Sequence, residues 1–241
     1  MSIAIPNDGA VVTRELMQSI PEPSFTNSWH PISHRKCDIA VEESIFSTGA
    51  GIVQRLYSLS KDGLEAYGKL VLNTGGTNDI SQTLIWRNSL NKHFSFGICG
   101  GTHAWACSNL MMFGEFVEFR RHTNGMNEDE LGRIVTRGIN NIMPELEHQE
   151  QWHRNLHEYK LNEEQTRALA YDAIQQDVIS KRKINEFDSL LFGENHEYNP
   201  NELFGFHGAC TQLLREQNMT RVVERQSRIY NFVNSYIESA A

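Results

Sequence analysis

Basic and aromatic side chains alternate along the middle of this chain in a pattern that suits contact with a nucleic-acid strand. Arg87 and Lys92 follow Trp86, and Arg120 and Arg121 stand at the end of a later apolar run. Cations can hold the phosphates of a single strand while aromatic rings stack on its bases, since every base offers a flat face. We therefore take six residues as candidate nucleic-acid contacts: Arg87, Lys92, Arg120, Arg121, Trp86 and Trp105.

The same pattern also suits an ordinary β-sheet with core aromatics and a solvated basic rim. Neighbouring residues of a strand point to opposite faces, so only one residue of each adjacent pair can line a given face. If one face is buried, Trp86 belongs in the core beside Leu84. We then expect Arg87 and Arg121 on the outer face.

Motifs for catalysis or cofactor binding are not found in the chain. It has no Gly-x-x-x-x-Gly-Lys-Ser/Thr, Gly-x-Gly-x-x-Gly, Gly-x-Ser-x-Gly or His-Glu-x-x-His sequence. The glycines of 97–101 lie among expected strands, where they predict a bulge or a bend that curves the sheet. His153 and His157 are four residues apart on a predicted helix, with His148 nearby, and could share a metal ion or belong to a solvated face. Without a third fixed ligand we assign no metal, no cofactor and no enzymatic activity.

The composition is that of a globular protein. Of 241 residues, 39% are hydrophobic, and no run approaches the roughly 18 consecutive apolar residues of a membrane helix. The four cysteines form no Cys-x-x-Cys pair, and residues 1–6 lack the features of a secretory signal, so we expect a cytoplasmic protein. The net charge of −8 argues against polyanion binding by overall charge but allows a local basic groove.

The elements that position these residues change character along the chain. Residues 1–32 carry four of the six prolines and predict an arm, with a short helix around 11–20. Ser33 can cap a helix that ends near Ser47, and Asp62-Gly63 predicts a hairpin turn. The expected strands are 52–59, 64–72, 83–88, 94–99, 104–107 and 116–120.

Beyond residue 127 the apolar residues follow a helical period. Asn127 and Asn162 are expected to cap helices, with Glu130 and Gln165 three residues further on. Pro144 either kinks the first of these helices or opens a new one. We predict an α+β fold in which an antiparallel β-meander is followed by several α-helices. Its expected limits are an arm over 1–32 and one domain over 33–241, with the sheet in 52–122 and the helical part in 127–238.

Three short motifs stand in order along the predicted sheet: Asn88-Ser89, Cys107-Ser108-Asn109 and Arg121-His122-Thr123. They resemble the Asn-Ser, Cys-x-Asn and Arg-His-Thr motifs of a phage- and plasmid-encoded family of unknown function (domain of unknown function 932). The turn Leu90-Asn91-Lys92 departs from that family's usual His-Asp-Gly-Ser. A hairpin-built sheet followed by a long helix is also similar to the core of single-strand annealing proteins, which form rings or filaments and bind DNA along a basic groove.

These resemblances imply a phage-encoded, non-enzymatic protein that binds or anneals single-stranded DNA in replication, recombination or transcription. They also imply a homo-oligomer in the cytoplasm of the bacterial host, with the arm and the segment 219–238 as candidate contacts between subunits. A second hypothesis is a phage protein that binds and redirects or inhibits a host or phage protein without touching DNA. The acidic net charge favours this second hypothesis, whereas the basic and aromatic strands favour the first.

Overall fold

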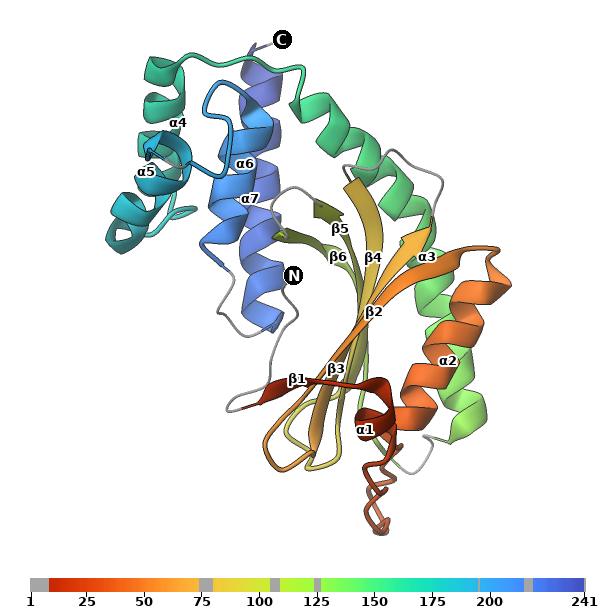
Figure 1. The fold of residues 1–241 in the computed structure, drawn as a ribbon. Helices are drawn as coiled ribbons and strands as arrows, with labels where there is room; N and C mark the ends of the chain where they lie inside the picture. Colours follow the sequence, from red (N-terminus) through yellow and green to blue (C-terminus); the bar gives the residue numbers. More distant parts are fainter. Residues whose placement is uncertain are drawn as a thin grey trace.

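A single antiparallel sheet runs through the molecule, with helices on both sides (Figure 1). The computed structural model describes residues 9–73, 80–104, 109–123, 127–194, 196–214 and 219–240. Each strand pairs with its neighbours in sequence, in the order β1-β2-β3-β4-β5-β6, which confirms the predicted α+β meander. The strands are β1 (Ala10–Val12), β2 (Gly51–Leu59), β3 (Glu65–Asn73), β4 (Ile80–Ser89), β5 (Phe96–Ala104) and β6 (Asn109–Arg120).

Two helices cover one face of the sheet, and helices of the C-terminal half lie on its other side (Figure 1). The first two are α2 (His34–Ser47) and α3 (Glu128–Leu156). Helix α7 (Met219–Ala240) packs along strand β6. The other helical elements are α1 (Arg14–Gln18), α4 (Glu163–Gln175), the short 3-10 helix η1 (Lys181–Lys183), α5 (Ile184–Phe192) and α6 (Leu203–Gln212).

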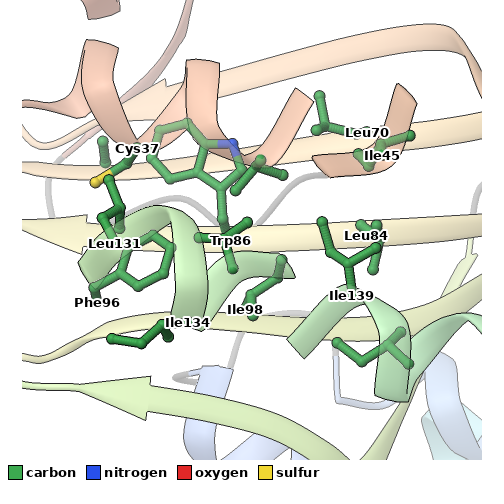
Figure 2. Packing of buried hydrophobic residues seen from close by; sticks show 14 of the residues in the cluster. Cys37, Ile45, Leu70, Leu84, Trp86, Phe96, Ile98, Leu131, Ile134 and Ile139 are labelled. Atoms are coloured by element: carbon green, nitrogen blue, oxygen red, sulfur yellow. The ribbon is translucent and has the colours of Figure 1, made fainter. Parts of the chain in front are cut away.

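The face of the sheet below α2 and α3 forms one of two hydrophobic cores (Figure 2). Trp86 of β4 is completely buried in it, with Leu84 on the same face of the strand. Gly68 of β3 stands directly opposite Trp86, and a Cβ at Gly68 would lie 2.3 Å from the indole ring. The indole therefore fills the space that a larger residue at 68 would need. Helices α2 and α3 close over the ring with Cys37, Ile45, Leu131, Ile134 and Ile139.

Three of the helices begin where the sequence predicts. The side chain of Ser33 caps α2, that of Asn127 caps α3, and that of Asn162 takes part in a capping box at the start of α4. Pro144 lies inside α3, which continues for 29 residues without a break. Within the described ranges, no helix combines the length and the apolar character that crossing a membrane requires.

The strands after the first hairpin are longer and fewer than expected. Three strands, β4 to β6, take the place of the four short ones predicted over 83–120, because pairing with long neighbours extends a strand beyond its own apolar residues. The strand expected at 104–107 is wrong at its start, since Ala104 is the last residue of β5, and 105–108 lie outside the described residues. The bulge or bend predicted at these glycines is confirmed by a register shift between Cys99 and Gly101.

The N-terminal arm enters the core as well as covering an edge. The short helix predicted around 11–20 is confirmed as α1, and before it β1 pairs with the end of β2. Met17 is completely buried, and Arg14 donates to Asp38 of α2 (2.7 Å) and also pairs with Glu42. The sequence could not indicate this outcome, because the arm is held by partners more than 20 residues away.

Replacement of Gly68 by alanine should lower the free energy of unfolding by about 1–3 kcal/mol, because the new Cβ overlaps the buried Trp86 ring. Gly132 of α3 is the matched control, since a Cβ there meets nothing within 4 Å. Gly132→Ala should raise stability by about 0.5–1 kcal/mol through its helix propensity. Urea unfolding followed by circular dichroism measures both, and an unchanged stability of Gly68→Ala would contradict this packing.

Candidate functional site

The side chain of Asn88, near the end of β4, connects segments that are far apart in the sequence. Its Nδ2 donates to the Ile32 carbonyl (2.8 Å) and to Nδ1 of His34 in α2 (3.0 Å). Its Oδ1 accepts a hydrogen bond from Nε2 of His122, which follows β6 (2.9 Å). Asn88 is fully buried, so these bonds satisfy polar atoms that water does not reach. Two of the three short motifs noted in the sequence therefore meet at Asn88 and His122.

These bonds determine which ring nitrogen carries the proton in both histidines. Because Asn88 Nδ2 donates to His34 Nδ1, the His34 proton is on Nε2, which donates to the Gly63 carbonyl (3.0 Å). Because Asn88 Oδ1 only accepts, the His122 proton is also on Nε2. Burial lowers the pKa of His122, and it lowers the pKa of His34 to about 4, so both rings are neutral near pH 7.

The loop between β4 and β5 has a polar framework of its own. Ser89 Oγ and Asn91 Oδ1 both accept from the backbone N–H of His93, at 3.0 and 3.1 Å. Glu65 of β3 accepts from Asn91 Nδ2 (3.0 Å) and pairs with His93 Nδ1 (2.6 Å). Lys92 has a φ of 67°, a left-handed conformation that a non-glycine residue keeps only when its surroundings hold it. The loop therefore presents Lys92 and His93 in defined positions.

A cleft of about 370 Å³ opens where this loop, the N-terminal arm and the segment after β6 meet; we call it the arm–loop cleft. Its volume lies at the lower end of the range for small-molecule sites, ~300–1,000 Å³, which leaves room for about one nucleotide. His122 forms part of its wall and is only 5% exposed. Its lining residues include Trp29, Lys92, His93, Phe94, Arg121 and His122.

Two cations and an indole ring give the arm–loop cleft its chemical character. The Nζ of Lys92 lies 4.8 Å from the centre of the Trp29 ring, which is a cation–π contact. Arg121 is exposed, and neither Arg121 nor Lys92 has a carboxylate partner among the residues that the structure describes. His93, by contrast, is already paired with Glu65. The cleft can therefore attract an anionic group through Lys92 and Arg121.

The structure brings together two of the six predicted nucleic-acid contacts, because Lys92 and Arg121 both line the cleft. Trp86 is completely buried in the core and offers no face on which a base could stack. Arg87 lies on the opposite face of β4, as strand alternation predicts, but it is only 7% exposed. The expectations for two residues stay predictions, since their side chains lie outside the described part: Arg120 and Trp105.

Arg87 packs against Phe94, one of the residues that line the cleft. Its guanidinium carbon lies 4.9 Å from the centre of the Phe94 ring, and the Tyr67 ring centre is 5.8 Å from that of Phe94.

Sequence reasoning missed Trp29 and did not assign a role to His122, although both carry a local signal. Trp29 stands in a proline-containing arm where an aromatic residue needs a contact, and His122 belongs to the Arg-His-Thr motif.

The three histidines considered for a metal site do not converge. His148 is exposed, and His153 is completely buried with its ring 4.9 Å from that of Trp152. His157 pairs instead with Glu202 (2.9 Å). Across the described ranges, no group of three or more histidine, cysteine, aspartate or glutamate residues is placed to hold a metal ion.

Comparisons of the chain with protein-family models, with curated proteins and with solved structures found no match. The family resemblance noted in the sequence therefore stays a prediction. The functional argument rests on the geometry of the arm–loop cleft.

Acidification should destabilise the protein through its buried histidines. The pKa of His34 falls from about 6.5 in the unfolded chain to about 4 in the folded protein, because burial disfavours the charged ring. The unfolded state therefore binds more protons between these two values, and stability is lost as the pH falls from 6.5 toward 4. His34 alone contributes about 1.4 kcal/mol of loss per pH unit in that window, measured by urea unfolding at several pH values.

Asn88→Asp tests the Asn88 hydrogen bonds by placing a carboxylate between the two buried rings. A carboxylate beside the rings of His34 and His122 raises their pKa in the folded state, so this variant should lose less stability on acidification than the wild-type protein. The exposed His148, replaced by glutamine, is the control and should behave like the wild type. Equal losses in Asn88→Asp and wild type would show that the network is not formed.

Proposed function

We propose that the protein binds single-stranded DNA at the arm–loop cleft, as a non-enzymatic phage protein of replication, recombination or transcription. The observation that carries this proposal is the presence of Lys92 and Arg121 beside the Trp29 ring, in a cleft with room for about one nucleotide. Cations beside an aromatic ring suit a strand, because phosphates need positive charge and bases need a flat surface. The phage context comes from the sequence resemblance.

The two cations would contact phosphate in different ways. The guanidinium of Arg121 can donate two parallel hydrogen bonds to one phosphate, whereas the ammonium of Lys92 acts as a point charge. Within the described part of the chain, neither side chain is paired with a carboxylate, so neither has to break an ion pair in order to bind phosphate. The net charge of −8 does not prevent this binding, because charges more than about 10 Å away are largely screened at 0.1 M salt.

The arm adds aromatic surface beside the cleft. Phe25 is 75% exposed, and its ring centre lies 5.3 Å from that of His30, the residue next to Trp29. Phe25 and Trp29 thus replace the buried Trp86 as candidate stacking surfaces. A strand that leaves the cleft along the arm would pass Phe25.

Assembly of several copies would extend so short a contact. Strand β1 pairs only with Tyr57–Leu59, and along Gly51–Leu56 the outer edge of β2 has no strand partner in the described part of the chain. Open strand edges tend to pair with other chains. We therefore keep the homo-oligomer as part of the proposal. Light scattering at micromolar concentration should give a mass above that of one chain, and a monomer would contradict this part.

A second candidate function is binding to a host or phage protein without DNA contact. The observation that favours it is a set of apolar side chains on the arm, on α2 and on the edge of the sheet, each more than half exposed. They are Val11, Leu16, Phe25, Phe46 and Val53.

Charge reversal at the cleft tests the DNA-binding proposal. The double variant Lys92→Glu/Arg121→Glu should weaken binding of a labelled DNA single strand, and it should lower the slope of log affinity against log salt by about one unit per lost phosphate contact. Fluorescence anisotropy at several salt concentrations measures both quantities.

The control for this experiment is Lys181→Glu/Arg182→Glu. Lys181 and Arg182 are exposed on η1, outside the cleft, so this variant makes the same change in net charge elsewhere. Equal losses of affinity in the two double variants would exclude the cleft as the binding site. If the wild-type protein binds no single strand, the protein-binding function takes precedence.

A further inference from the structure

The arm–loop cleft combines its two cations, Lys92 and Arg121, with three hydroxyl side chains. Ser28 of the arm, Ser95 of the loop before β5 and Thr123 after β6 all line the cleft. None of the three hydroxyls has a hydrogen-bond partner among the residues that the structure describes. Hydroxyl, ammonium and guanidinium groups are the side-chain donors that proteins use to bind phosphate oxygens. The cleft therefore holds more phosphate donors than its two charges alone.

No carboxylate opposes these donors inside the cleft. Among the described residues that line it, none is an aspartate or a glutamate. Glu65 reaches the loop, but its carboxylate accepts from Asn91 (3.0 Å) and pairs with His93 (2.6 Å). The positive charges of Lys92 and Arg121 are therefore available to a ligand.

The size and the walls of the cleft favour the end of a strand over its middle. The arm, the loop between β4 and β5 and the segment after β6 each contribute lining residues, and about 370 Å³ leaves room for about one nucleotide. An internal nucleotide enters such a cleft with the strand continuing on both of its sides, whereas a terminal nucleotide continues on one side only. Because only one nucleotide fits, both cations act on the charge of one phosphate group.

We propose that the cleft binds the terminal phosphate monoester of a DNA single strand, at the 5′ or the 3′ end, in preference to an internal phosphodiester. This inference rests on the proposed function, since it names the part of the strand that Lys92 and Arg121 hold. A phosphate monoester carries a charge of about −1.5 to −2 at pH 7 and three strongly accepting oxygens. An internal phosphodiester carries a single negative charge and fewer free oxygens, so it leaves one of the two cations without a counter-charge.

The test compares three single strands of the same sequence by fluorescence anisotropy at one salt concentration, with the dye on the opposite end. One strand ends in a hydroxyl, one in a phosphate, and one in a phosphate capped by a methyl ester, which has the charge of a diester. Placing the phosphate at the 5′ end and then at the 3′ end shows which end the cleft takes. At one of the two ends the uncapped phosphate should tighten binding about tenfold over both other strands, the effect of about one charge-assisted hydrogen bond.

A protein-side comparison uses Arg121→Gln, which should reduce the preference for the uncapped phosphate because it removes one of the two cations. Arg182→Gln makes the same change at an exposed position of η1 outside the cleft and should keep the preference. Equal affinity for the capped and uncapped strands at both ends, with binding still weakened in Lys92→Glu/Arg121→Glu, would overturn the preference and leave the proposed function intact. An unchanged preference in Arg121→Gln would also overturn it, and failure of every strand to bind would remove both proposals.

Discussion

Asn88 is fully buried, and its carboxamide bonds at once to the Ile32 carbonyl, the ring of His34 and the ring of His122. These partners come from the end of the arm, the start of α2 and the segment after β6. A buried amide has no water with which to replace a lost bond, so its hydrogen bonds are complete only when all three segments are in place. The arm–loop cleft lies between two of these segments, and its shape therefore depends on this single side chain.

The core of the protein determines where Asn88 can stand. Leu84, Trp86 and Asn88 alternate on the face of β4 that lies below α2 and α3, and the Trp86 ring fits only against a glycine at 68. A slip of one residue would turn Arg87 into the apolar core and move Asn88 to the other face. Packing of an apolar ring thus sets the register, and the register sets the polar network that shapes the cleft.

Local signals in the sequence were sufficient for the elements but not for the site. The caps at Ser33 and Asn162 and the turn at Gly63 are predictable because each depends on a few adjacent residues. Strand alternation placed Arg87 on the correct face, yet alternation does not reveal whether both faces are covered. Lys69, on that same face, is completely buried, and burial lowers its pKa to about 8. The cleft could not be predicted for a similar reason, since it joins residues 29, 92 and 122, which only the tertiary structure brings together.

Nitrogen NMR of the histidine rings tests the central claim most directly, because the chemical shift of a ring nitrogen shows whether it carries a proton. A His122→Phe spectrum assigns the signals of that ring. The account predicts a neutral His122 near pH 7 with the proton on Nε2, where it donates to Asn88 Oδ1. A proton on Nδ1 alone, or rapid exchange between the two tautomers, would contradict it.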